Sequence, residues 1–529
     1  MRLAPLAVAL ATVAVLAGCG GSGTSEKLTR GGTLTIGIPA ETPGWNPYWQ
    51  SWSESGELVG SAFYESLAAI GKDGKVHPYL AKSITASTDL RHYTIVLRPG
   101  IRFHDGTPFN ARAVAYGLHQ NTLATSPHGV AMNSIRRIVV IGPLKLRVDL
   151  TRPRSDFMGA LANGEGGAIA SMKAARTDGD RLNTHPVGTG PFRFVSWKRD
   201  NEVVVERNPD WWQHRGGPAL QRIVFKVIPD PQARFDSLRS GQLDLAYLDA
   251  GRQLTQAKAA GLKGQVFTPD AVNAVTLNVA KPPFDNIHAR RAVIYAIDRH
   301  AIAKVDASTP ADQVFTPANA NHLEDVGYPA FDLAAAKREM AAYEAETGKP
   351  LSFTFGCIPG AVFSQLAQLE QAMLAKAGMR VSLKTQDFAS YVQAVFGGKY
   401  QAGCWRTDPM ANPAVVFGYS LQPVKFAADG SKKSGFANAT NFSSPEVQAR
   451  LQRAGTSPDP AVRRQSFQDI SRILARELPY AITDYVAVGF FWRPDIVAVP
   501  TKLPDGTPSG TISQSLSIKN IDWTGFGKR

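Results

Sequence analysis

Residues 401–409 read Gln-Ala-Gly-Cys-Trp-Arg-Thr-Asp-Pro, a short apolar strand that ends abruptly in the turn-forming pair Asp408-Pro409. In an open α/β sheet, the ligand crevice lies just beyond the carboxyl ends of the strands. Trp405 and Asp408 are therefore candidates for one edge of a binding site. The alternative interpretation is purely structural, with Trp405 in the hydrophobic core and Asp408 capping a turn through its side-chain oxygen.

The sequence before this segment alternates predicted strands with predicted helices. These elements are expected at residues 351–355, 363–377, 381–385, 389–396 and 400–405. Such alternation predicts a parallel βαβαβ unit, in which Cys357 and Trp405 fall at carboxyl ends of strands. Further upstream, we expect a helix that begins at Asp332, runs to Glu346 and stops at Gly348.

The chain has three cysteines, Cys19, Cys357 and Cys404. Because Cys357 and Cys404 end two predicted strands, one disulfide between them is compatible with an oxidising compartment. Two unpaired, buried thiols are the alternative.

The N-terminus has the pattern of a secretory signal. Met1-Arg2 supplies a short positive start, residues 3–16 are apolar, and Leu16-Ala17-Gly18-Cys19 closes the run. This run is shorter than the roughly 20 residues that a membrane span needs. Its ending resembles the bacterial lipobox, so we expect residues 1–18 to be removed and Cys19 to carry a diacylglycerol. A plain signal cleaved near Ala17 is the alternative.

Composition excludes some classes of protein. The 529 residues include 44% hydrophobic and 19% charged residues, as expected for a globular chain of two or three domains. The formal net charge is +14, but Lys and Arg do not cluster among aromatic residues, so we expect no nucleic-acid partner. A diffuse positive charge suits a protein held beside an anionic membrane.

Aromatic residues and catalytic motifs give further expectations. Trp45, Tyr48 and Trp49 lie among prolines, and one regular element cannot pack all three, so we expect some to line a surface or cleft.

His104-Asp105 forms a turn rather than a catalytic pair. The G-x-S-x-G, H-E-x-x-H, P-loop and C-x-x-C motifs are absent, so we predict no catalytic residue and no cofactor. No histidine follows His322, which argues against a metal site in the C-terminal half.

Four separated segments resemble the extracellular solute-binding proteins of peptide-type ABC importers, family 5. The resemblance extends from about residue 31 to about residue 492. Its segments are 103–109 (Phe-His-Asp-Gly-Thr-Pro-Phe), 186–212 (from Pro-Val-Gly-Thr-Gly-Pro-Phe to Asn-Pro-Asp-Trp-Trp), 233–244 (from Ala-Arg-Phe to Gly-Gln-Leu-Asp) and 277–299 (from Leu-Asn to Ala-Ile-Asp-Arg).

The resemblance implies an α/β, two-lobed fold of the periplasmic-binding-protein type (class II), with an extra inserted domain. The lobes are expected to hinge near Pro282-Pro283-Phe284 and near Thr483-Asp484-Tyr485. The expected division is 1–18 signal peptide, 19–27 lipidated tether, 28–65, 186–284 and 486–529 first lobe, 66–185 inserted domain, and 285–485 second lobe.

The resemblance also implies a function, the capture of a small solute for a membrane permease by a monomeric lipoprotein outside the cytoplasm. The solute expected first is an oligopeptide or dipeptide, whose ammonium group would pair with Asp408 beside Trp405. Trp45, Tyr48 and Trp49 would add an aromatic wall from the other lobe. The alternatives are a non-peptide solute such as a metal chelate, opine or glycoside, or a secreted hydrolase.

Overall fold

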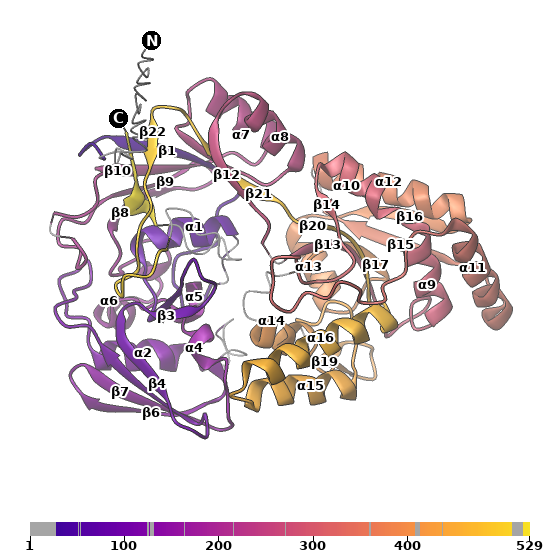
Figure 1. Cartoon of the computed structure of the whole chain (residues 1–529), viewed down its shortest axis with the longest axis horizontal. Helices are drawn as coiled ribbons and strands as arrows, with labels where there is room; N and C mark the ends of the chain where they lie inside the picture. Colours follow the sequence, from indigo (N-terminus) through magenta and orange to yellow (C-terminus); the bar gives the residue numbers. More distant parts are fainter. Residues whose placement is uncertain are drawn as a thin grey trace, which may run out of the picture.

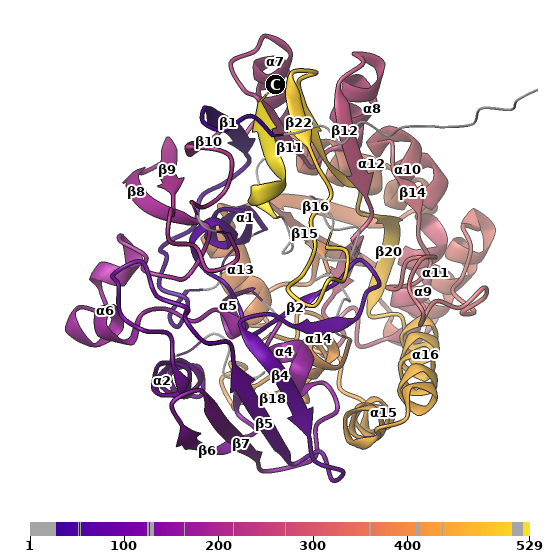
Figure 2. The same cartoon turned by 60° about the vertical axis from the view of Figure 1, so that its left-hand side comes forward.

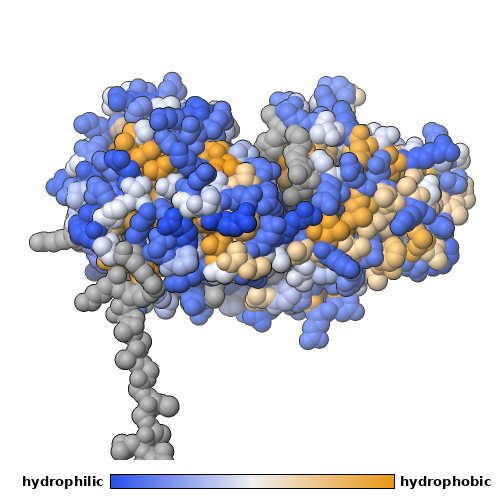
Figure 3. Space-filling view, turned by 90° about the horizontal axis from the view of Figure 1, so that it is seen from above, coloured by the Kyte–Doolittle hydropathy of each residue, from blue (hydrophilic) through white to orange (hydrophobic). Residues whose placement is uncertain are grey.

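The structure, a computed structural model, describes residues 28–528 except 51, 53, 124–125, 127–131, 163, 215, 270, 359–360, 408–412, 436 and 510–521. Its elements form two bodies, each built on its own β-sheet (Figure 1). This arrangement agrees with the predicted two-lobed α/β fold. Seen from above, hydrophilic residues cover most of the first body, and hydrophobic groups are more evident over the second (Figure 3).

The first sheet has seven strands. In spatial order they are β12 (Lys263–Phe267), β21 (Val488–Trp492), β11 (Leu245–Leu248), β1 (Thr33–Ile38), β10 (Arg222–Val227), β9 (Glu202–Arg207) and β8 (Phe192–Lys198). β1 pairs in parallel with β10 and β11, and its alternating side chains bury Leu34 and Ile36 completely. The helices of this body are α1 (Glu54–Phe63), α7 (Pro231–Arg239) and α8 (Gly251–Ala259).

The second sheet has six strands. Their order is β14 (Thr309–Pro310), β20 (Tyr480–Tyr485), β13 (Val272–Leu277), β17 (Ala402–Arg406), β15 (Ser352–Cys357) and β16 (Arg380–Thr385). β15 pairs in parallel with both β16 and β17, which confirms the predicted βαβαβ unit. The helices of this body are α9 (Ile287–Ala296), α10 (Arg299–Asp306), α11 (Leu333–Thr347), α12 (Ala361–Ala377), α13 (Phe388–Phe396), α14 (Pro413–Ser420), α15 (Pro445–Thr456) and α16 (Pro460–Glu477).

Local capping explains where the best-predicted helix begins and ends. The Asp332 carboxylate accepts a hydrogen bond from the backbone N–H of Ala335 at the start of α11. Gly348 ends the helix with a φ of 68°, a left-handed conformation that glycine adopts without a steric penalty. Both signals are local, and the prediction for this helix is confirmed.

A third, antiparallel sheet lies at the lower edge of the first body, where α2 (Ala111–Gln120) covers it (Figure 2). Its order is β4 (Ala81–Ala86), β5 (His92–Leu97), β7 (Lys145–Leu150) and β6 (Ile135–Gly142). Three two-stranded sheets are β2 (Ala68–Ile70) with β3 (Val76–Pro78), β18 (Lys425–Phe426) with β19 (Lys432–Ser434), and β22 (Ile496–Ala498) with β23 (Phe526–Lys528). The short helices are α4 (Phe157–Ala160), α5 (Gly164–Gly167), α6 (Met172–Thr177), η1 (Arg181–Asn183) and η2 (Trp523–Gly525).

The chain changes sheets twice. It first passes from β12 to β13, so it has joined the second sheet by Val272. The crossing expected at Pro282-Pro283-Phe284 is therefore placed too late, because β13 already pairs with β17 and β20. The return runs from the end of β20 to Val488 in β21, directly after the expected segment Thr483-Asp484-Tyr485. The remaining lobe boundaries stay a proposal.

Candidate ligand-binding site

β17 carries the predicted edge of the site. Asp408 lies outside the described residues, and its role in ligand binding stays a prediction. Trp405 is partly buried, and its ring meets Phe396 edge-on with 5.7 Å between centroids. It also borders a small cavity of about 50 Å³ together with Val416 and Phe417. Trp405 therefore packs partly into the core, and its contact with a ligand also stays a prediction.

Cys357 and Cys404 form a disulfide, with their Cα atoms 5.1 Å apart. The bridge joins β15 to β17 near their carboxyl ends, where Gly356 stands opposite Gly403 in the parallel register. The covalent link fixes the spacing of these two strand ends beside Trp405.

The aromatic segment takes a different position from the one expected. Trp45 and Tyr48 are each only 1% exposed and belong to the core of the first body. The Trp45 ring packs against Phe63 and Trp197, with centroids 5.4 and 5.5 Å away. The expectation that Trp45 and Tyr48 form an aromatic wall is wrong in this conformation, because enclosed rings cannot present a face to a ligand. Trp49, at 41% exposure, is the accessible ring of the three.

Arg406, the last residue of β17, is held in a fixed orientation. Its Nε donates a hydrogen bond of 3.3 Å to Oδ1 of Asn273, its partner across the β13–β17 ladder. Asn273 in turn donates through Nδ2 to Oδ2 of Asp484 at 3.0 Å. Asp484 is fully buried and also accepts a hydrogen bond from the Thr483 hydroxyl at 2.7 Å. This relay orients a guanidinium group with further N–H donors at the end of the strand.

Acidic groups of both bodies create the electrostatic environment of Arg406. Burial alone would lower the pKa of Arg406, but Glu54, Tyr247, Asp249 and Asp306 together raise it. Glu54, Tyr247 and Asp249 come from the first body, at the start of α1 and the end of β11. Acidic groups of both bodies therefore act electrostatically on Arg406 at the carboxyl end of β17.

The acidic residues on the first body have partners of their own. The Tyr247 hydroxyl donates to Glu54 at 2.6 Å, and the fully buried Arg234 forms an ion pair with Asp249. Asp306, on the second body, has its pKa raised to about 7 by burial and then by the nearby charge of Asp484. The guanidinium of Arg406 is thus not required to neutralise Glu54 or Asp249 by direct contact.

Sequence reasoning missed Arg406 and the residues opposite it. Strand alternation predicts that Arg406 points away from Trp405, and Trp405 does pack into the second body while Arg406 extends towards the first. The sequence indicated on which side of the strand the Arg406 side chain lies. It did not indicate which residues lie opposite, because Glu54 and Tyr247 are remote from Arg406 in the chain.

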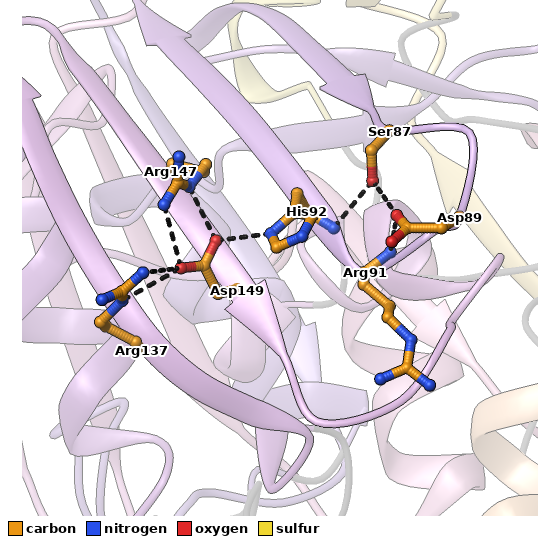
Figure 4. A network of polar contacts seen from close by, with 7 residues as sticks. All are labelled: Ser87, Asp89, Arg91, His92, Arg137, Arg147 and Asp149. Carbon is orange, nitrogen blue, oxygen red and sulfur yellow. Dashed lines mark hydrogen bonds and ion pairs between the residues drawn. The ribbon is translucent and has the colours of Figure 1, made fainter.

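A cluster on the third sheet, β4-β5-β7-β6, contains a serine, a histidine and an aspartate (Figure 4). His92 Nδ1 lies 2.7 Å from Asp149, whose carboxylate also accepts from Arg137 and Arg147. The Ser87 hydroxyl donates to Asp89 rather than to the His92 ring, and its oxygen accepts the His92 backbone N–H at 3.0 Å. A nucleophile–base relay needs a hydrogen bond between the serine and the ring. This cluster therefore stabilises the third sheet by linking β5, β6 and β7.

His104 has a structural position too. Its Nε2 lies 3.0 Å from the carbonyl oxygen of Gly190, and burial lowers its pKa to about 4.

Within the described ranges, no group of three or more His, Cys, Asp or Glu side chains is placed to hold a metal ion. Those same ranges contain no helix with the length and apolar character to cross a membrane.

Comparison with known proteins gives the class of this chain. The family model described as bacterial extracellular solute-binding proteins, family 5 (middle), matches residues 75–423. The chain belongs to this family. The resemblance inferred from four sequence segments is confirmed, and the protein is a solute-binding protein of an ABC importer.

Relatives of this solute-binding protein differ in what they bind. The glutathione-binding protein GsiB of Salmonella typhi is 29% identical over 440 residues, covering 80% of this chain and 83% of the relative. The oligopeptide-binding protein AppA of Bacillus subtilis, solved with a nonapeptide, has a TM-score of 0.80 and 20% identity, covering 95% and 100% of the two chains. AgaA of A. tumefaciens R10, solved with agropinic acid, has a TM-score of 0.76 and 22% identity, covering 94% and 99%. These structural matches establish the fold alone.

Proposed function

We propose that this solute-binding protein is anchored outside the cytoplasm through a lipid on Cys19 and captures a short peptide between its two bodies. The observation that carries the proposal is the favourable electrostatic interaction of Arg406, at the carboxyl end of β17, with Glu54, Tyr247 and Asp249 of the other body. A ligand there touches both bodies, so its binding favours the closed arrangement over the open one. The closed, loaded protein then delivers the peptide to the permease.

A peptide suits the charges at the end of β17. Its carboxylate matches the planar guanidinium of Arg406, which can bind two oxygens at once. Its ammonium group would pair with Asp408, as the family resemblance implies. The relatives that bind glutathione and a nonapeptide support this class of solute.

A non-peptide solute is the second candidate. It is supported by solved structures of the same fold that hold agropinic acid in one case and a nickel–histidine complex in another. These solutes also carry carboxylates, so Arg406 would serve them as well. The identity of the group that faces Asp408 distinguishes the candidates.

Gentle purification followed by mass spectrometry of the released solute tests the proposal. We expect a peptide that raises the melting temperature when it is added back, and that is recovered unchanged. Asp408→Asn should weaken its binding by about 2 to 5 kcal/mol, because a buried ammonium group would lose its counter-ion. A released solute without an amino group would favour the second candidate, and conversion of the peptide to products would contradict both.

Attachment has its own test. Cys19→Ala should release the protein from membranes or leave its signal uncleaved, whereas a matched Ser22→Ala change in the tether should do neither. Unchanged processing and membrane association of Cys19→Ala would contradict the lipid anchor.

A further inference from the structure

A basic pocket lies on the second body, away from the proposed peptide site. Its volume is about 350 Å³, and its lining includes Lys281, Lys384 and Lys399 with the polar side chains of Gln386 and Gln401. The pocket borders the start of β17, whereas Arg406 ends that strand. Its lining also reaches Gly356, which stands opposite Gly403, so at about 3.3 Å per residue the pocket ends about 10 Å short of Arg406 along the strand. The pocket is therefore a separate site.

Two of the lysines that surround this pocket are held by backbone carbonyl groups. Lys281 Nζ donates to the carbonyl oxygen of Gly398 at 3.0 Å, and Lys432 Nζ donates to that of Asn438 at 2.8 Å. A Cβ atom on Gly398, which lines the pocket, would lie only 3.4 Å from Lys432 Cε. Lys432, which is 6% exposed, thus stands directly behind the pocket wall. Three lysines from separate segments therefore line this cavity, and a fourth, Lys432, lies behind its wall at Gly398.

The charges are not balanced by acidic neighbours. No carboxylate belongs to the described lining of the pocket. Two acidic residues outside the lining act on it: Glu370 raises the pKa of Tyr391 after burial does, and Lys399 lowers the pKa of Asp429 after the Ser431 hydroxyl does. Burial, and then the charge of Lys281, lowers the pKa of Lys432 to about 8. Converging ammonium groups repel one another, and an anion in the cavity would relieve that repulsion.

We propose that this pocket binds a phosphate group. Lysine presents a compact, hydrated charge and is a common phosphate ligand, whereas arginine is preferred for flat carboxylates. A doubly charged phosphate matches several lysines better than a single carboxylate does. The phosphate belongs either to a free phosphate ester or to the headgroup of an anionic lipid beside the anchored protein.

The test compares wild type with the double variant Lys384→Gln/Lys399→Gln. Both lysines are exposed, so their exchange should leave the melting temperature unchanged. Lys433→Gln is the matched control, because Lys433 is exposed on β19 next to Lys432 and outside the pocket lining. Calorimetric titration with inorganic phosphate and with glycerol 3-phosphate, at constant ionic strength, should show saturable binding that weakens at least tenfold in the double variant. The control should bind like wild type.

Flotation with lipid vesicles identifies the source of the phosphate. The chain without its lipid is mixed with vesicles of phosphatidylglycerol or of phosphatidylcholine. Binding to phosphatidylglycerol alone, lost in the double variant, assigns the pocket to a lipid headgroup. Binding of the soluble phosphates without flotation assigns it to a free ester. The proposal is overturned if none of these probes binds, or if each binds wild type and double variant equally.

Discussion

Arg406 is the residue on which the proposed binding of a peptide carboxylate depends. Its Nε donates to Asn273, so the outer N–H groups of the guanidinium are the donors that a ligand at the end of β17 would meet. The neighbouring carboxylates of Glu54 and Asp249 already bind Tyr247 and Arg234. A ligand carboxylate can therefore approach Arg406 without displacing a structural ion pair.

Arg406→Gln tests this role, because it keeps a hydrogen-bonding side chain of similar reach and removes the charge. We expect peptide affinity to fall by about 2 to 5 kcal/mol, since a buried carboxylate would lose its charged partner. A peptide amide, which lacks that carboxylate, should bind both proteins equally weakly. The control is Arg453→Gln, which removes an exposed charge on α15. Equal affinity of wild type and Arg406→Gln for the free peptide would refute the role.

At the scale of elements, α8 of the first body lies beside α10 of the second (Figure 1). A Cβ atom at Gly251, the first residue of α8, would lie 1.7 Å from the carbonyl oxygen of Asp306, the last residue of α10. Only glycine permits this approach of two backbones. This backbone contact between the two bodies therefore depends on glycine at position 251.

Gly251→Ala should force α8 and α10 apart. We expect the free energy of unfolding to fall by about 1 to 3 kcal/mol, the usual cost of overpacking a close contact. Gly418→Ala in α14 is the control, because its added Cβ would meet nothing within 4 Å. Urea denaturation of both variants measures the difference, and equal stability would show that the two helices separate freely.

The sequence predicted elements better than it predicted their surroundings. The helix from Asp332 and the parallel strands around Cys357 follow from local caps and periodicity, so they were predictable. Trp45 was misplaced because its burial depends on Phe63 and Trp197, which pack against it only in the folded body. The first crossing was misplaced because the partners of β13 lie more than a hundred residues later in the sequence.

At the scale of the whole molecule, buried carboxyl groups make stability depend on pH. Burial raises the pKa of Glu65 to about 7, that of Asp306 to about 7 and that of Glu370 to about 8. Nearby Asp484 raises the last two further. Each folded-state pKa exceeds its unfolded value, so the folded protein binds more protons in this range. Stability is then lost as the pH rises through these values.

We therefore expect the free energy of unfolding to increase as the pH falls from 8 to 6.5. Below pH 6.5, the buried His104 acts in the opposite direction, because burial lowers its pKa to about 4. Glu370→Gln should stabilise the protein at pH 8 by about 1 to 3 kcal/mol and have little effect at pH 5. Urea denaturation of wild type and Glu370→Gln at pH 8, 6.5 and 5 measures these free energies of unfolding. A Glu370→Gln effect of the same size at pH 5 and pH 8 would exclude ionisation as its cause.

In the proposed mechanism, a solute bound between the two sheets draws the bodies together. Small-angle X-ray scattering of the purified protein, before and after addition of the solute that copurifies with it, tests this most directly. We expect a smaller radius of gyration with solute in wild type, and no change for Arg406→Gln at the same solute concentration. Solute that binds to wild type with full affinity and leaves the radius of gyration unchanged would contradict the claim.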